Sequence, residues 1–256
     1  MISRSLTAVI LAAALIAGLA TGMSWSAFSS QTQSSGSGFS AAATFSPEFV
    51  GQLGSGSCTG GSSTVTVPAG GVPAGTTVIV SLVLRGTTAG TVGASDPGGN
   101  SYSIDADVTG NGLRTVMLSS RLDTALAAGD TITVSHSFSD DSQGISAAAF
   151  TGISSGTRVD ATGTATGDST SPSATAATGY EWDVLVGAVG SSNNRTYTEA
   201  AGWSTLSDVL ANCGGAPRRA TLHSAYLIVS NTGSYDYSPT ISNGERWAEV
   251  LVAYRG

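Results

Sequence analysis

Lysine is missing from the sequence, and charge of either sign is sparse. All ten basic residues of the 256-residue chain are arginines, and only 11% of its residues are charged. Isopeptide-stapled adhesins and sortase-built pili both need a lysine amine as nucleophile, so covalent polymerisation by either route is excluded. The exposed faces of helices carry Glu, Lys and Arg, and no stretch longer than about six residues shows a convincing helical period.

The acidic balance narrows the range of partners. The net charge is −7 and the isoelectric point is about 4.6. Nucleic-acid binding depends on a positive surface that meets the phosphates, so we expect no nucleic-acid partner. An acidic surface mainly keeps a protein soluble.

Histidine and catalytic motifs are equally scarce. The only histidines are His136 and His223, and the HExxH zinc motif is absent. Residues 152–156 match the G-x-S-x-G pattern, which would pair Ser154 with His223, but that motif needs a helix after the serine, and Gly-rich sequence follows instead. In a chain so rich in Ser and Gly we interpret the match as chance. We predict a protein that is not an enzyme, without a cofactor.

The two cysteines, Cys58 and Cys213, match one disulfide in an oxidising compartment. This bridge would close a loop of about 155 residues, for which the chain-entropy account gives roughly 5 kcal/mol at most. Two separate thiols are the alternative.

Two aspartate pairs are candidate ligands for Ca²⁺, which binds six to eight oxygens. Asp105 and Asp107 would lie on one face of a strand, and Asp140 and Asp141 would lie in a loop. Neither pair matches a known calcium loop. We favour solvated turns and assign no metal ligand.

Strand patterns recur along the whole chain, and its 34 glycines suit tight turns. Residues 77–84 and 182–189 are apolar on both faces, which is typical of central strands. Residues 131–138 alternate, with Ile132, Val134, His136 and Phe138 on one face. Further strands are expected at 221–229 and 246–254, turns at 96–100 and 111–112, a helical turn at 123–128 and a polar loop at 167–179.

These patterns predict an all-β protein, an antiparallel β-sandwich of jelly-roll or immunoglobulin-like type, with a single domain over residues 47–256. The stretches 95–102, 127–134 and 247–255 resemble β-sandwich modules of bacterial secreted and phage-borne surface proteins. That resemblance implies no enzymatic role.

The N-terminus has the pattern of an export signal. Arg4 precedes an uncharged apolar run over residues 6–23, which is followed by small residues that favour cleavage after Ala27. We therefore predict a signal peptide over residues 1–27 and a secreted, cell-surface protein. The alternative is an uncleaved segment that anchors the chain in the membrane.

The junction Ala27-Phe28-Ser29-Ser30 and the later Gly38-Phe39-Ser40-Ala41 resemble the processing region of proteins with SipW-dependent signal peptides. That group includes camelysin and the TasA biofilm-fibre proteins. The resemblance covers about the first 45 residues and departs at Ser29, Gln31 and Ala42. It implies export and, in part of the group, assembly into fibres.

Residues 28–46 form a Ser/Gly-rich segment between signal and domain. As an extended strand it would place Phe39, Ala41, Ala43 and Phe45 on one face. Together with Phe28, these residues could add to the sheet edge of a neighbouring copy. A plain linker, or a first strand of its own domain, is the alternative.

The functional prediction is a structural or adhesive protein of the cell surface or extracellular matrix, whose partner is a further copy of itself in a homo-oligomer or a filament. The alternative is a carbohydrate-binding module with a surface glycan as partner. Its aromatic platform would be drawn from Trp182, Trp203, Trp247, Tyr235 and Tyr237, with Tyr235 and Tyr237 as an exposed pair.

Overall fold

The computed structural model describes residues 46–57, 62–86, 90–137, 142–213 and 218–256. Residues 43–256 form one compact unit. Every element in the described part is a strand, and neighbouring strands run antiparallel, which confirms the all-β prediction. The predicted signal peptide lies outside the described residues.

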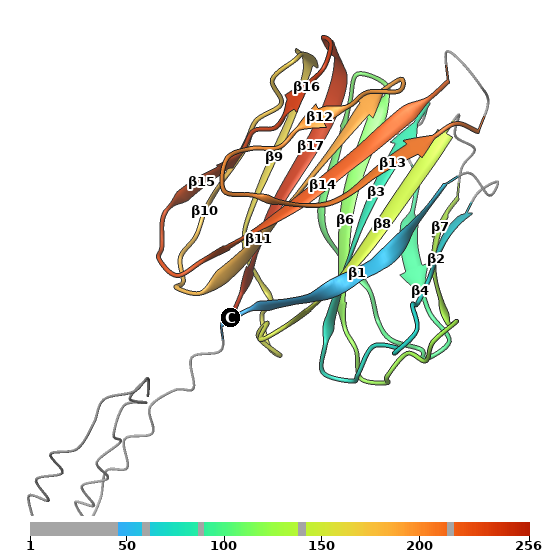
Figure 1. Cartoon of the computed structure of the whole chain (residues 1–256), viewed down its shortest axis with the longest axis vertical. Coiled ribbons are helices and arrows are strands. Elements are labelled where there is room, and N and C mark those ends of the chain that lie inside the picture. Colours follow the sequence, from blue (N-terminus) through green and yellow to red (C-terminus); the bar gives the residue numbers. More distant parts are fainter. Residues whose placement is uncertain (1–45, 58–61, 87–89, 138–141, 214–217) are drawn as a thin grey trace, which may run out of the picture. The chain divides into compact units, whose positions relative to one another are not determined.

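Two five-stranded sheets pack face to face (Figure 1). The first sheet has the order β1 (Glu48–Ser57), β8 (Ser142–Thr151), β3 (Thr77–Arg85), β6 (Leu113–Arg121) and β5 (Ser103–Gly110). The second has the order β13 (Ser204–Ala211), β14 (Ala220–Val229), β11 (Asp183–Ser192), β17 (Glu245–Arg255) and β9 (Val159–Ser169). Side chains from both sheets, including Ile79, Met117, Phe150, Val186 and Tyr254, fill the central core between them.

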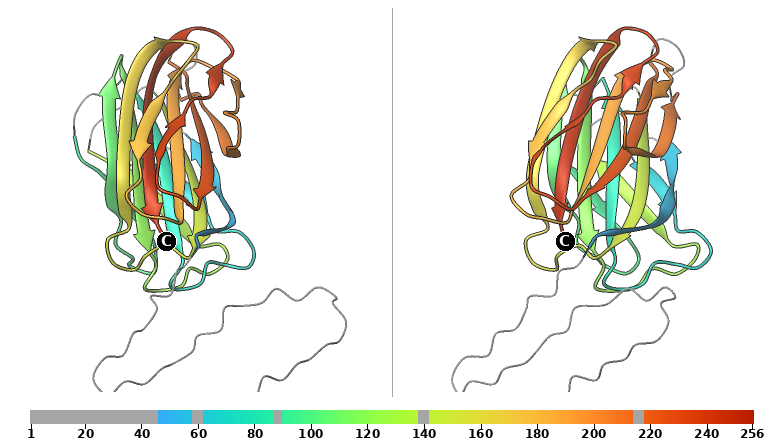
Figure 2. Two further views of the ribbon diagram at one scale, coloured as in Figure 1. Left: turned by 90° about the vertical axis from the view of Figure 1, so that its left-hand side faces the viewer. Right: turned by 60° about the vertical axis from the view of Figure 1, so that its left-hand side comes forward.

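Each sheet is also covered on its outer face (Figure 2). Strands β2 (Ser62–Thr66), β7 (Thr131–His136) and β4 (Val92–Ser95) cover the first sheet and enclose a second core. The pairs β10 (Ala174–Ala177) with β15 (Ser234–Tyr237), and β12 (Tyr197–Thr198) with β16 (Thr240–Ile241), cover the second sheet and enclose a third core. The central strands are therefore buried on both faces.

This layering explains the sequence of the central strands. β3 and β11, predicted as central because both of their faces are apolar, lie in the middle of the two sheets. Ile132 and Val134 of β7 are buried as the alternation predicted. Asn111 and Gly112 have φ of 57° and 77° and join β5 to β6 in a two-residue hairpin, as expected of an Asn-Gly turn.

Two local predictions were wrong. The polar loop expected at 167–179 contains the end of β9 and the whole of β10, because the cover layer needs a strand there. The helical turn expected at 123–128 is absent. Leu126 instead forms a bridge with Val72 and is buried in the second core, so tertiary packing overrides the weak local helical preference.

The second half of the chain repeats the strand arrangement of the first. Read from β9, the second sheet has the order β9-β17-β11-β14-β13, which matches β1-β8-β3-β6-β5 strand for strand. Across the central core β1 faces β13 and β5 faces β9. The equivalent strands β8 and β17 finish at the same end, where Ser154 donates its amide hydrogen to the Arg255 carbonyl at 2.7 Å. The two halves are therefore related by an approximate two-fold axis along the strands.

The repeat extends to the pairing register. β5 has an irregularity between Ile104 and Ala106 after its first two pairs, and β13 has one between Thr205 and Ser207, also after its first two pairs. β1 and β9 are likewise both irregular near their first residues.

Equivalent residues can be assigned from the core. Thr77 of β3 pairs with Phe150, and Val184 of β11 pairs with Tyr254. Phe150 and Tyr254 are both members of the central core. Thr77 and Val184 are therefore equivalent positions in the two halves.

Candidate functional site

The residues predicted to drive assembly, Phe28, Phe39, Ala41 and Phe45, lie outside the described residues. The described chain starts at Ser46 and enters β1, an edge strand of the first sheet. Two large apolar side chains of β1 are open to solvent there: Phe49 is 37% exposed and Val50 is 53% exposed. Phe49 stacks on Tyr226 of β14 with 4.8 Å between ring centroids.

Cys58 also lies outside the described residues, so the disulfide remains a prediction. The described neighbours of the two cysteines come close together. Ser57, the last residue of β1, pairs with Gly144 of β8. The preceding residue of β8, Gln143, donates its backbone amide to Cys213 Sγ, 3.4 Å away.

Two of the four aspartates considered for calcium are held by other groups. Asp107 forms an ion pair with Arg114 at 2.6 Å, and Asp105, at the irregularity of β5, accepts a hydrogen bond from the Tyr254 hydroxyl at 2.7 Å. They do not form a common site. Asp140 and Asp141 lie outside the described residues.

The predicted exposed aromatic pair does not exist. Tyr237 is fully buried and packs on Trp203 with 4.5 Å between ring centroids. Trp203 and Trp247 are also buried, because the cover strands close over the second sheet. Tyr235 is half-buried and donates its hydroxyl to the Asn231 carbonyl. The prediction of an exposed platform at Tyr235 and Tyr237 was therefore wrong, because Tyr237 packs in the core.

Ser154 and His223 lie far apart. Ser154 sits against Arg255, which pairs with Asp183 at the start of β11. His223 pairs with Val189 further along the same strand. The separation along β11 is roughly 20 Å at the usual rise per residue, so these two side chains do not meet.

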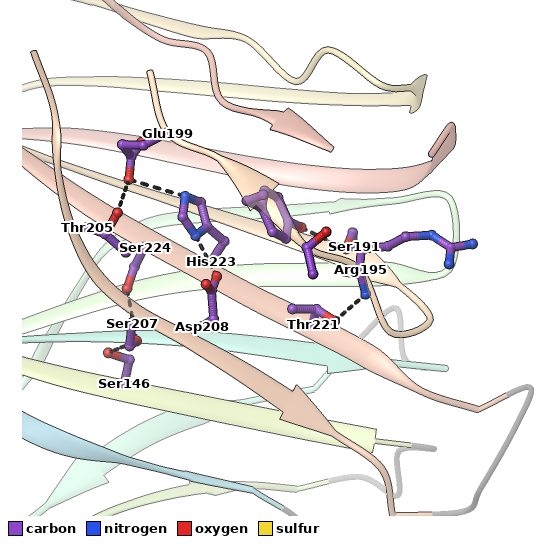
Figure 3. A network of polar contacts seen from close by, with 12 residues as sticks. Ser146, Ser191, Arg195, Glu199, Thr205, Ser207, Asp208, Thr221, His223 and Ser224 are labelled. Atoms are coloured by element: carbon purple, nitrogen blue, oxygen red, sulfur yellow. Dashed lines mark hydrogen bonds and ion pairs between the residues drawn. The ribbon is translucent and has the colours of Figure 1, made fainter. Parts of the chain in front are cut away.

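His223 is the centre of a polar network on the outer face of the second sheet (Figure 3). Its Nδ1 lies 2.6 Å from Asp208 Oδ1 on the neighbouring strand β13, and its Nε2 lies 3.3 Å from Glu199 Oε2. Glu199 follows β12 and also accepts a hydrogen bond from Thr205 at 2.8 Å. Tyr197 stacks on the imidazole with 4.3 Å between ring centroids.

The two carboxylates decide the charge of the imidazole. Burial lowers the pKa of His223, but the hydrogen bonds and charges of Asp208 and Glu199 outweigh burial and raise it above its usual value. Burial by itself would raise the pKa of Glu199, and its hydrogen bonds to His223 and Thr205, with the imidazolium charge, lower it. The arrangement stabilises a charged imidazolium and ties the edge strand β13 and the segment after β12 to the sheet.

Two further carboxyl groups are buried in the second sheet. Both oxygens of Glu249 and both of Asp183 lack a hydrogen bond of good geometry, and both residues are fully buried. Burial raises the pKa of Glu249 well above its usual value. Burial, together with the neighbouring Asp160, raises the pKa of Asp183 to about 7.

Within the described ranges, no group of three His, Cys, Asp or Glu residues is placed to hold a metal ion. The sequence did not indicate the partners of His223. Asp208 lies on a strand whose pattern is too weak to predict, and Glu199 lies in a connecting segment. An Asp directly opposite a His becomes visible only once β13 and β14 are paired in register.

No known family, curated protein or solved structure matches the chain. No helix in the part of the chain that the structure describes is long and apolar enough to span a membrane.

Proposed function

We propose that the chain is an exported, non-enzymatic structural or adhesive protein of the cell surface or extracellular matrix. Its copies join when the segment Phe28–Phe45 of one adds as a strand to the sheet of another. The observation that carries this proposal is that the residues next to this segment in the sequence form an edge strand, β1, in which Phe49 and Val50 are exposed.

The described residues build three apolar cores. Our proposal assigns the segment 28–45 to contact with a second copy. Strand addition takes its affinity from main-chain hydrogen bonds and its register from alternate side chains. Phe39, Ala41, Ala43 and Phe45 supply such an alternation.

The first test compares protein beginning at Phe28 with protein beginning at Ser46, by light scattering and negative-stain microscopy. The proposal expects filaments or oligomers from the longer chain alone. Monomers from both chains at all concentrations would reject the assembly step.

A matched pair of variants tests the geometry of the added strand. Ala41→Glu places a charge on the face that carries Phe39 and Phe45, and Ala42→Glu places the same charge on the opposite face. We expect Ala41→Glu to abolish assembly and Ala42→Glu to preserve it. Equal effects of the two substitutions would contradict an alternating donor strand.

A further inference from the structure

The segment between β10 and β11 exposes two aromatic side chains at one end of the sandwich. Tyr180 is 49% exposed and Trp182 is 36% exposed. Trp203 and Trp247 are buried, so Trp182 is the one exposed tryptophan in the described part of the chain. Both exposed rings lie within three consecutive residues, with the exposed Glu181 between them.

Trp182 has an unusual backbone. Its φ is 63°, in the left-handed region that bulky side chains avoid. Residues held in this region need surroundings that enforce it, and they are concentrated at functional sites. Here Gly256 donates its amide hydrogen to the Trp182 carbonyl at 2.9 Å, and the next residue, Asp183, is buried and paired with Arg255.

The internal repeat shows what this backbone position holds in the other half. Thr77 and Val184 are equivalent, and two residues before them stand Gly75 and Trp182. Gly75 has φ of 86°, so both halves use the left-handed conformation at this point. Glycine adopts it without strain. The second half has a tryptophan instead, at a conformational cost that a glycine would avoid. We interpret this cost as a sign that the exposed part of the ring has a role in binding.

Polar groups hold the aromatic segment and surround it. The guanidinium of Arg255 lies 3.9 Å from the centroid of the Tyr180 ring and covers one of its faces. Asp160 Oδ2 accepts hydrogen bonds from the amides of Gly179 and Tyr180 at 2.6 and 3.4 Å. The segment is thereby fixed before any ligand arrives.

The nearby loop 154–158 adds hydroxyl groups. It lies along Arg255, whose carbonyl accepts the Ser154 amide and whose own amide donates to the Arg158 carbonyl at 2.8 Å. Ser155 and Thr157 of this loop are exposed.

We propose that Tyr180 and Trp182, with Glu181 and Arg255, form a binding site for a polysaccharide. A pyranose ring has a face of C–H groups, which stacks on an aromatic ring, and a rim of hydroxyls, which bonds to carboxylate, guanidinium and hydroxyl groups. A stable protein interface would need about 1,000 Å² or more of buried surface, whereas here two rings stand among polar groups. The site occurs once per chain, because Gly75 occupies the equivalent position. It uses other residues than the assembly proposed above, and its test does not depend on that assembly.

The test is binding of the mature chain to a printed panel of bacterial, fungal and plant glycans. Titration calorimetry with the tightest-binding glycan of the panel follows. We expect one site per chain and a loss of affinity of roughly tenfold or more in Tyr180→Ala, the loss typical of a central aromatic contact. Quenching of Trp182 fluorescence by the glycan should disappear in Trp182→Gly, which keeps a residue suited to the left-handed backbone.

Leu210→Ala is the matched control, because Leu210 is 39% exposed but lies toward the far end of β13. Circular dichroism and the unfolding temperature establish whether each variant is folded. If Trp182→Gly does not fold, the test of the proposed site rests on Tyr180→Ala. No binding to any glycan of the panel overturns the proposal. Unchanged glycan affinity in folded Tyr180→Ala overturns it too. If Tyr180→Ala loses self-association but keeps its glycan binding, the rings are a contact between copies and the proposal is also rejected.

Discussion

Asp208 and His223 face each other across the β13–β14 pair, with 2.6 Å between Asp208 Oδ1 and His223 Nδ1. On the other side of the imidazole lies Glu199, 3.3 Å from Nε2. Because the ring is 2% exposed, an edge strand and a connecting segment are joined to the sheet through one buried, charged side chain. The stability of this edge should therefore depend on pH.

The Glu199–His223 pair is expected to stabilise the fold most between pH 4.5 and 6.5. The folded pKa of His223 is raised above 6.5, so its contribution is fully present below 6.5 and is lost as pH rises through the folded value. The folded pKa of Glu199 is lowered below 4.5, so its contribution is present above 4.5 and is lost as pH falls through the folded value. We expect His223→Gln to lower stability by about 2 kcal/mol at pH 5.5, with a smaller loss at pH 9.

Thermal unfolding at both pH values checks this prediction. Asp208→Asn is the control, since the Asp208 side chain is 55% exposed and its charge is screened by solvent. Its effect should be smaller than that of His223→Gln. An equal loss from His223→Gln at both pH values would mean that the ring matters for its volume and not for its charge.

Asp183 should make the protein less stable as pH rises toward neutrality. Its folded pKa of about 7 exceeds the usual 3.8, so the folded state binds more protons between these values and loses stability across that window. We expect Asp183→Asn to remove this slope and to raise the unfolding temperature by about 5 °C at pH 8. Parallel unfolding profiles of wild type and variant from pH 4 to 8 would contradict this account.

Gly187 should not tolerate any side chain. A Cβ there would come within 2.2 Å of Cδ1 of Tyr237, whose ring is fully buried and cannot move aside. We expect Gly187→Ala to destabilise the fold by about 3 kcal/mol or more, measured by urea denaturation. Gly93→Ala in β4 is the matched control, because nothing lies within 4 Å of a Cβ there. Similar costs at both positions would show that the clash is relieved.

Cys58 and Cys213 should form a disulfide when the chain folds under oxidising conditions. Peptide mapping without reduction should recover the cross-linked pair, and its reduction should lower stability by up to roughly 5 kcal/mol. Cys213→Ser should reproduce the loss, and reduction should then have no further effect. Recovery of two free thiols from oxidised, folded protein would reject the bridge.

The sequence predicted those strands and turns whose own residues form a distinctive pattern. β3, β11 and β17 are continuous apolar runs because both of their faces are covered, and the Asn111–Gly112 turn follows from positive φ at both residues. β1 and β13 were missed because each is an edge strand of mixed or Gly/Ser-rich sequence. The reason for Gly56 appears only with β2 in place, where a Cβ would come 2.2 Å from the Thr64 carbonyl oxygen.

The candidate sites were less accessible to sequence reasoning than the fold. His223 could be identified as one of only two histidines, but the sequence does not indicate which carboxylates it meets. Trp182 was recognised as an aromatic residue, but nothing in its neighbourhood indicates a left-handed backbone. Only the comparison with Gly75, through the register of the two halves, makes that conformation informative.

The approximate two-fold axis has a consequence for how the chain folds and persists. Each half buries the inner sheet face of the other, so neither half is a folding unit alone, and the protein resembles a dimer whose subunits share one chain. An untethered dimer dissociates on dilution, whereas tethered subunits keep a fixed effective concentration. The integrity of this sandwich should therefore not depend on protein concentration.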